Sequence, residues 1–158
     1  MRIQTEVLVK RYQQNMYAAA LSACKDPQDA EDAVQDALLA YHTSGKEFDS
    51  EEHIRAWLLR VAINKAKNMR MSFWKKHKVT LEDYMESLTF ETPEETGLFE
   101  AVMNLPDKYR VVLHLFYYED YSIREISRIL RRTENTVKSQ LSRGRAMLKE
   151  SFKGGMEL

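Results

Sequence analysis

Two helical segments joined by only three residues constrain the fold of this 158-residue chain more than any other feature. The segments span residues 123–130 and 134–152. Ser122 is a typical helix cap, and Glu125, three residues later, completes a capping box. Apolar residues stand where the two helices would face each other: Ile126, Leu130, Val137 and Leu141. Packing of these side chains in the angle between the helices predicts a helix-turn-helix.

The outer face of the second helix combines small hydroxyl groups with long cationic side chains. Its members are Thr136, Lys138, Ser139, Ser142, Arg143 and Arg145. Such cations bind phosphates and guanine edges, and small polar groups let a helix backbone come close to DNA. The face therefore predicts a helix that enters the major groove. From the spacing alone, an ordinary helical hairpin with a solvated basic face is the alternative.

Helix is favoured in the rest of the chain as well, because only five Gly and three Pro interrupt it. Residues 7–23, 27–42 and 51–74 are predicted helices, with Asp26 and Pro27 marking the second start and residues 43–52 forming a loop. In residues 27–42 the apolar side chains share one face: Ala30, Ala33, Val34, Ala37, Leu38 and Tyr41. Residues 98–104 and 108–118 are further helices, so we expect an all-α fold.

The formal net charge of zero conceals a strong segregation of charge. Residues 53–78 contain eight Lys or Arg and no acidic residue, and residues 128–149 contain seven against Glu134 alone. Residues 26–36 and 79–107 are acidic without a single Lys or Arg. We therefore expect two basic faces and two acidic faces. Residues 79–96, which include Pro93, are predicted to form an acidic linker, with a solvated loop that binds nothing as the alternative.

Residues 121–148 resemble the promoter-reading C-terminal domain of bacterial sigma factors, in which a TVKS-x-L-x-R-x-R-x-x-L pattern forms the recognition helix for the −35 element. The matching residues are Thr136, Val137, Lys138, Ser139, Leu141, Arg143, Arg145 and Leu148. Glu134-Asn135 and Gln140 depart from the usual pattern. The resemblance implies that the six outward-facing residues named above bind −35 DNA.

The segment DPQDAEDAVQDALLAYH is similar to the sigma-factor helix that docks on the clamp coiled coil of the largest polymerase subunit. Its candidate polymerase-binding residues fall on one helical face: Asp29, Asp32, Gln35 and Asp36. An acidic stripe with an amide suits an arginine-rich helical partner. Without the resemblance, a solvated acidic face would be the simpler interpretation.

The segment HIRAWLLRVAINKAKNMRMSFWKK resembles the sigma-factor helix that engages the −10 element and helps to melt it. Its candidate DNA-binding residues are Arg60, Asn64, Lys67 and Asn68, of which Asn68 replaces the Asp common in the family. The preceding loop lies where the family captures an unstacked base, and Phe48 is a candidate stacking platform. Burial of Phe48 within the loop core is the other interpretation.

The resemblance covers nearly the whole chain and implies a sigma factor of the extracytoplasmic-function (ECF) type. It implies two small helical domains, residues 1–78 for polymerase docking and the −10 element and residues 97–158 for the −35 element, joined by the acidic linker 79–96. The implied partners are promoter DNA, core RNA polymerase through its clamp coiled coil and flap, and an anti-sigma factor. Scattered histidines and the lack of a phosphate-loop motif predict no catalysis, no metal and no cofactor.

Other classes of protein explain less of the sequence. No apolar run approaches the roughly 18–20 residues of a membrane-spanning helix, so no membrane insertion is expected. A single cysteine, Cys24, suits the reducing cytoplasm. A stand-alone helix-turn-helix regulator would leave the acidic face near Asp32 and the basic segment 60–78 unexplained. A helical adaptor that binds only proteins would show no salt-dependent affinity for DNA, against the clustered cations.

Overall fold

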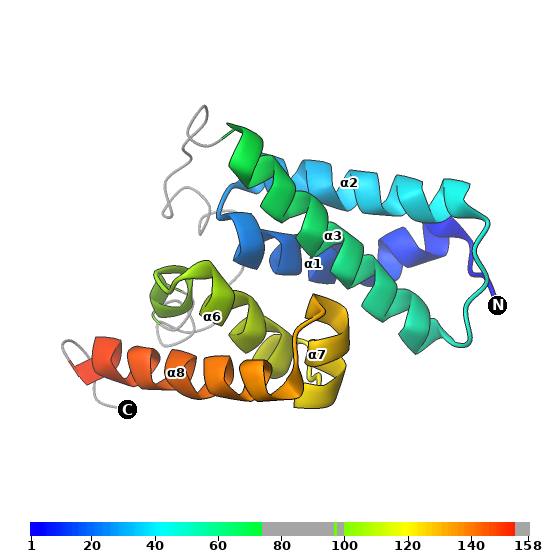
Figure 1. The fold of residues 1–158 in the computed structure, drawn as a ribbon. Coiled ribbons are helices and arrows are strands. Elements are labelled where there is room, and N and C mark those ends of the chain that lie inside the picture. The colour runs from blue at the N-terminus through cyan, green and yellow to red at the C-terminus, as the bar shows by residue number, and fades with distance from the viewer. Residues whose placement is uncertain (74–96, 98–99, 154–158) are drawn as a thin grey trace. The chain divides into compact units, whose positions relative to one another are not determined.

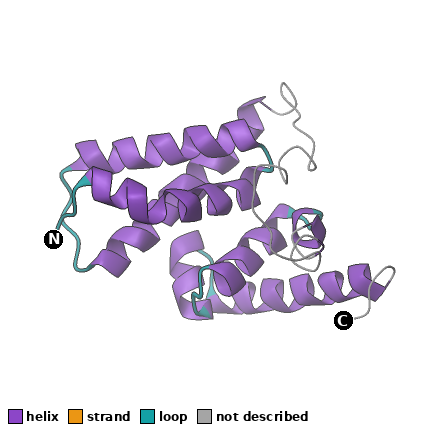
Figure 2. Ribbon diagram, turned by 180° about the vertical axis from the view of Figure 1, so that it is seen from behind, coloured by secondary structure: helices purple, strands orange, loops and turns teal. Residues whose placement is uncertain are grey.

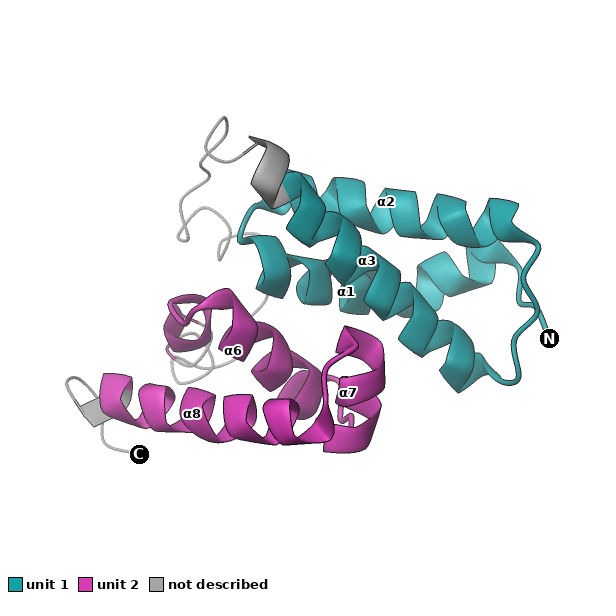
Figure 3. Cartoon of the chain, in the orientation of Figure 1, with its two compact units in different colours: residues 1–77 teal, residues 78–158 magenta. Residues whose placement is uncertain are grey.

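The computed structural model describes residues 1–73, 97 and 100–153, and all regular secondary structure within these ranges is helical (Figure 1, Figure 2). The chain divides into two compact units, Met1–His77 (unit 1) and Lys78–Leu158 (unit 2), each described by itself below (Figure 3). The predicted all-α class with two helical domains is confirmed. The predicted linker, residues 79–96, lies outside the described residues.

Unit 1 is a bundle of three long helices, α1 (Thr5–Cys24), α2 (Pro27–Ser44) and α3 (Glu51–Phe73), each of which packs against the other two (Figure 1). Alanines with no exposed surface line the contacts: Ala19, Ala20, Ala30, Ala33, Ala37, Ala62 and Ala66. Such small side chains let the helices approach closely, and larger ones such as Met16, Tyr41 and Leu58 fill the remaining space. The predicted apolar face of α2 is buried, apart from the half-buried Leu38.

The junction between α1 and α2 is built from local contacts. Lys25 adopts the left-handed conformation (φ 59°), and its N–H donates to the Leu21 carbonyl at 2.9 Å. The Asp26 carboxylate accepts the Asp29 N–H at 3.0 Å, and Pro27 occupies the first position of α2. The predicted cap and helix start are therefore confirmed.

Unit 2 contains α6 (Asp107–Leu113), the π-helix η1 (His114–Tyr118), α7 (Ile123–Leu130) and α8 (Glu134–Lys153), and residues 100–103 are helical as well. Ser122 accepts the Glu125 N–H at 3.1 Å and donates its own N–H to the Glu125 carboxylate at 3.0 Å, which is the predicted capping box. Three predicted core residues of the helix-turn-helix are buried, and the fourth, Leu130, is half-buried: Ile126, Val137 and Leu141.

The predicted helix over residues 108–118 is not uniform. Its second half is the π-helix η1, at the end of which the Glu119 N–H donates to the backbone carbonyl oxygen of His114, five residues back, at 3.3 Å. The wider turn leaves Tyr117 and Tyr118 about half exposed while Leu115 is fully buried. A π-turn places one extra residue in a helical turn, and it can form from the same residue types as an α-helix. The apolar pattern therefore did not reveal it.

α6 and α8 approach closely at Gly144. A Cβ atom added there would lie 3.0 Å from Leu113 Cδ1 and 3.3 Å from Tyr109 Cβ. Only glycine fits this contact without displacing a neighbour. The contact fixes the direction in which the outer face of α8 points.

Candidate nucleic-acid and polymerase interfaces

The α8 outer face consists of the six residues predicted to bind −35 DNA. All six side chains are exposed: Thr136, Lys138, Ser139, Ser142, Arg143 and Arg145. On the opposite side of the helix, Val137 and Leu141 are buried with at most 2% of their surface exposed. The structure thus brings the predicted residues together on one accessible, cationic helix face.

The start of α8 is set by Thr133. Its hydroxyl accepts the Thr136 N–H at 3.1 Å and donates to the Thr136 hydroxyl at 2.8 Å. Arg131 ends α7 in the left-handed conformation (φ 55°), and this reverses the chain within three residues. The turn therefore depends on conformations and hydrogen bonds of its own residues, and it aims the first turn of α8 outward.

Arg145 belongs to the α8 outer face but also contacts η1. Its Nε donates to the Tyr117 hydroxyl, and its guanidinium lies 5.2 Å from the Phe116 ring centroid and 5.5 Å from that of Tyr117. Stacking on two rings restrains the guanidinium. Arg145 is therefore held at one edge of the face.

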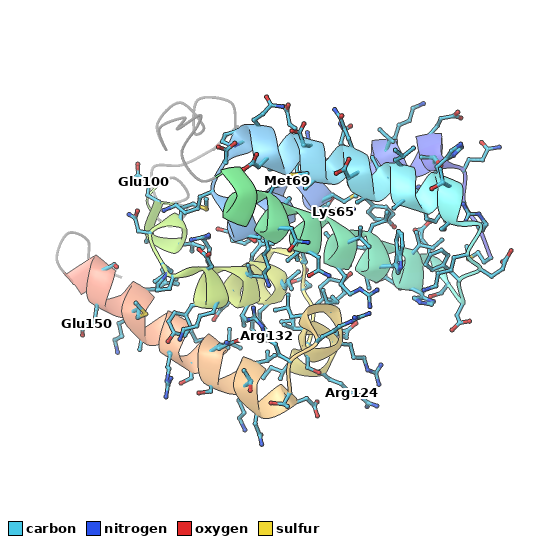
Figure 4. The ribbon with its side chains drawn as sticks, turned by 45° about the horizontal axis from the view of Figure 1, so that its top comes forward. Lys65, Met69, Glu100, Arg124, Arg132 and Glu150 are labelled. Atoms are coloured by element: carbon cyan, nitrogen blue, oxygen red, sulfur yellow. The ribbon has the colours of Figure 1, made fainter. Side chains whose placement is uncertain are left out.

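Gln140, where the sequence departs from the family pattern, has a defined role within unit 2. Arg132 Nη1 donates to Gln140 Oε1 at 2.8 Å and to the Lys108 carbonyl at 3.3 Å. Burial lowers the pKa of the Arg132 guanidinium from its ordinary value. Figure 4 shows Arg132 at the turn that leads into α8, and Arg124 projecting from α7. Sequence reasoning missed this link. Its only signal in the sequence is a glutamine, Gln140, eight residues after Arg132.

The α3 face consists of the four residues predicted to bind −10 DNA. Asn64 and Asn68 are exposed, and Arg60 and Lys67 are half-buried. Their spacing places them on one side of α3, while Ile63 and Ala66 are fully buried on the other. Lys65, labelled in Figure 4, adds an exposed cation to the same helix.

Phe48 belongs to the loop between α2 and α3, and its side chain is buried, with only 3% of its surface exposed. Its ring centroid lies 5.0 Å from that of His53, 5.6 Å from that of Tyr41 and 5.7 Å from that of Trp57. Of the two interpretations of Phe48, burial in the loop core is the one that the structure supports. The ring is not available as a platform for a base in this conformation.

The acidic stripe of α2 consists of Asp29, Asp32, Gln35 and Asp36. Gln35 is exposed and the three carboxylates are half-buried; Asp32 also accepts a hydrogen bond from Gln28 Nε2 at 3.2 Å. Leu39, one turn further along, is 60% exposed and interrupts the polar surface. Sequence reasoning missed Leu39, although the helical spacing of α2 already places this leucine outside the apolar face.

Two other properties concern the described residues alone. No three His, Cys, Asp or Glu side chains in residues 1–73, 97 and 100–153 converge so as to hold a metal ion. None of the helices described combines the length and the hydropathy needed to cross a bilayer.

The chain matches two protein-family models. Residues 8–76 match Sigma-70 region 2, and residues 97–148 match Sigma-70, region 4. The first match contains the acidic stripe and the α3 face, and the second contains the α8 outer face.

Curated relatives align along most of the chain. The ECF RNA polymerase sigma factor SigM of Mycobacterium tuberculosis is 30% identical over 150 residues, which cover 93% of this chain and 76% of the relative. The ECF RNA polymerase sigma factor SigM of Bacillus subtilis is 27% identical over 160 residues, which cover 94% and 95%.

Solved structures of the same fold contain a second protein. The sigma factor RpoE in complex with the anti-sigma factor NepR from Bartonella quintana has a TM-score of 0.72 and 22% identity, and covers 94% of this chain and 96% of its own. CnrH in complex with the cytosolic domain of CnrY has a TM-score of 0.68 and 23% identity, and covers 96% and 88%. The two family matches and the similarity to curated sigma factors show that this chain belongs to the sigma-70 family as a sigma factor of the ECF type, which directs RNA polymerase to promoters and is not an enzyme.

Proposed function

We propose that the two units read promoter DNA through two different surfaces while the acidic stripe of α2 binds core RNA polymerase. The observation that carries the proposal is the exposure of all six α8 residues opposite a buried side. A helix with this geometry presents cations and hydroxyls to a groove without disturbing its own packing.

The α8 outer face reads the −35 element. Lys138 and Arg143 contact guanine edges or phosphates, because they are exposed and lie near the N-terminal half of the helix. Thr136, Ser139 and Ser142 let the backbone approach the DNA. Arg145 has a narrower role, since its contacts with η1 restrain it to the phosphates at one edge.

The α3 face binds the −10 element. The amides of Asn64 and Asn68 suit the hydrogen-bonding edges of bases, and the cations Arg60 and Lys67 suit the phosphates beside them. Binding to unpaired bases stabilises the open form, so melting proceeds without a nucleotide cofactor. The exposed residues of the loop before α3 contact the captured base, and Phe48 supports that loop from below.

The acidic stripe docks on the clamp coiled coil of the largest polymerase subunit. Asp32 and Asp36 pair with arginines of the partner, and the exposed Leu39 adds an apolar contact at the C-terminal edge of the charged surface. The flap is the second polymerase contact that we propose, and unit 2 is the part of the chain that meets it.

A protein inhibitor of the anti-sigma type is a further proposed partner. The support is that two solved structures of this fold each hold a second protein. Such a complex would leave transcription inactive until the inhibitor is released. We propose the bacterial cytoplasm as the compartment, because transcription takes place there.

The proposal is tested by run-off transcription with core polymerase on the DNA upstream of the protein's own gene. Lys138→Ala and Arg143→Ala should each lower −35-dependent transcription by about tenfold, the value of one good base contact. Core polymerase association should not change. Lys108→Ala removes an exposed cation of α6 and serves as the charge-matched control. Equal loss of transcription and polymerase binding would contradict the assignment of roles.

A second variant separates the two DNA elements. Asn64→Ala should impair promoter opening more than formation of the closed complex, because the proposed contact exists only with unpaired bases. Permanganate footprinting measures the opening, and filter binding on ice measures the closed complex. A variant that loses both to the same extent would argue against the melting role of α3.

A further inference from the structure

The loop between α2 and α3, residues 45–50, is held by the first residues of the chain. Arg2 Nη1 donates to the Lys46 carbonyl at 2.7 Å, and Nη2 donates to the Tyr41 carbonyl at 2.9 Å. The guanidinium carbon lies 4.4 Å from the centroid of the Tyr41 ring. One cation therefore joins the last turn of α2 to the loop through two charge-assisted hydrogen bonds.

The backbone on either side of Arg2 completes this contact. The Phe48 N–H donates to the Met1 carbonyl at 3.1 Å. The Tyr41 hydroxyl accepts the Ile3 N–H at 2.9 Å and donates to the Ile3 carbonyl at 2.7 Å. Tyr41 is fully buried, so these bonds lie in a defined position. We call residues 1–3 with these contacts the N-terminal clamp.

The opposite side of the loop is fixed by the ring cluster around Phe48 and by the start of α3. Gly45 turns the chain in the left-handed conformation (φ 62°), and the Ser50 hydroxyl accepts the His53 N–H at 3.1 Å. Between these points the side chains of Lys46, Glu47 and Asp49 are exposed. The loop therefore presents exposed polar groups on a backbone that is held from two sides.

We propose that Arg2 is a positioning residue for recognition of the −10 element, because the N-terminal clamp holds the loop in one conformation before DNA binds. The inference rests on the proposed function of this loop in capturing an unpaired base. A loop that is ordered in advance adapts less to an incorrect base and discriminates better. Arginine suits the position, since its planar fork reaches two carbonyl oxygens on two different elements.

The first measurement is amide hydrogen exchange on the full chain. Arg2→Met keeps the length of the side chain but removes the fork, and should accelerate exchange in residues 45–50 about tenfold, as expected for losing hydrogen bonds to a charged group. Arg2→Lys should give an intermediate rate. Lys10→Met removes an exposed cation from α1 and should change nothing. Unchanged loop exchange in Arg2→Met would overturn the proposal.

The second measurement is initiation by core polymerase with each variant on a pool of promoters with a fixed −35 element and a randomised −10 element. Arg2→Met should reduce the preference for the favoured base at one −10 position by about threefold or more, with −35 preference and polymerase association unchanged. Faster loop exchange with unaltered base preference would overturn the positioning role. If the unchanged protein had no −10 preference, the proposed function itself would fail, and the exchange result would assign the clamp a purely structural role.

Discussion

The two units position their proposed DNA-binding surfaces by different means. In unit 2, the N-terminal starts of α7 and α8 are set by hydrogen bonds between residues three apart, between Ser122 and Glu125 and between Thr133 and Thr136. In unit 1, the loop before α3 is held by contacts between residues 38 to 47 positions apart. A contact between residues close in the sequence costs less chain entropy than a contact between distant residues. The start of α8 in unit 2 is therefore specified locally, whereas the loop of unit 1 depends on the whole three-helix bundle.

This difference can be followed because tryptophan occurs in only one of the two units. Trp57 and Trp74 are the only tryptophans of the chain, and both lie in unit 1. Tryptophan fluorescence therefore reports on unit 1, and circular dichroism at 222 nm reports on the helices of both. A change confined to unit 2 should move only the second signal.

The largest expected effect comes from the double reversal Asp32→Arg with Asp36→Arg. Placing two cations opposite an arginine-rich partner should weaken core polymerase association about 100-fold or more. The helical content should be retained, since both carboxylates reach the surface of α2. Fluorescence anisotropy with labelled protein measures the association. The control reverses two exposed acidic residues outside the stripe, Glu6→Arg with Glu31→Arg. Retained association in the test variant would move the anchor to unit 2.

Gly144→Val should destabilise unit 2 next most strongly. A side chain at this position meets Leu113 at 3.0 Å, and overpacking of this kind costs about 1–3 kcal/mol in the free energy of unfolding. In urea, the circular dichroism transition of unit 2 should shift while the tryptophan transition does not. Ser139→Val, on the exposed face of the same helix, is the control for β-branching. If both signals shifted together, the units would not unfold separately.

Thr133→Ala should have a smaller effect that is again confined to unit 2. The change removes the hydroxyl that caps α8 and costs about 1 kcal/mol. Thr133→Ser keeps the hydroxyl and should retain stability. The same urea titration distinguishes the two variants. A serine variant as unstable as the alanine variant would show that the methyl group, and not the cap, matters at this position.

The parts of the fold that local chemistry determines could be predicted from the sequence. The cap at Asp26, the capping box at Ser122 and the exposed face of α8 follow from residue type and helical spacing, and the structure contains them. The candidate site residues of α8 share a face for the same reason, since a period of 3.6 residues fixes which side chains lie together.

The contacts that join distant residues could not be predicted in this way. The N-terminal clamp, the burial of Phe48 and the bond from Arg132 to Gln140 depend on where whole helices meet. The π-helix η1 depends on a single inserted residue within an apolar segment. In each case the residue types are compatible with several partners, and only tertiary packing selects one.

The smallest effect that we expect is a pH dependence confined to unit 1. The Tyr12 hydroxyl donates to Glu51 Oε2 at 2.8 Å. Burial, that hydrogen bond and the charges of Glu51 and Glu52 raise the pKa of Tyr12 from 10.0 to about 12. The fold therefore favours the neutral phenol. Its contribution to stability is complete below pH 10 and is lost as the pH rises from 10 towards 12.

The comparison of Tyr12→Phe with the unchanged protein isolates this contribution, because the two proteins differ only in this hydroxyl. Between pH 9 and pH 11 the tryptophan unfolding midpoint of the unchanged protein should fall further than that of Tyr12→Phe. The circular dichroism transition of unit 2 should change equally in the two proteins, since Tyr12 lies in α1. An equal fall of the tryptophan midpoint in both would mean that the bond from Tyr12 to Glu51 does not couple α1 to the start of α3, and that unit 1 depends less on its distant contacts than its structure indicates.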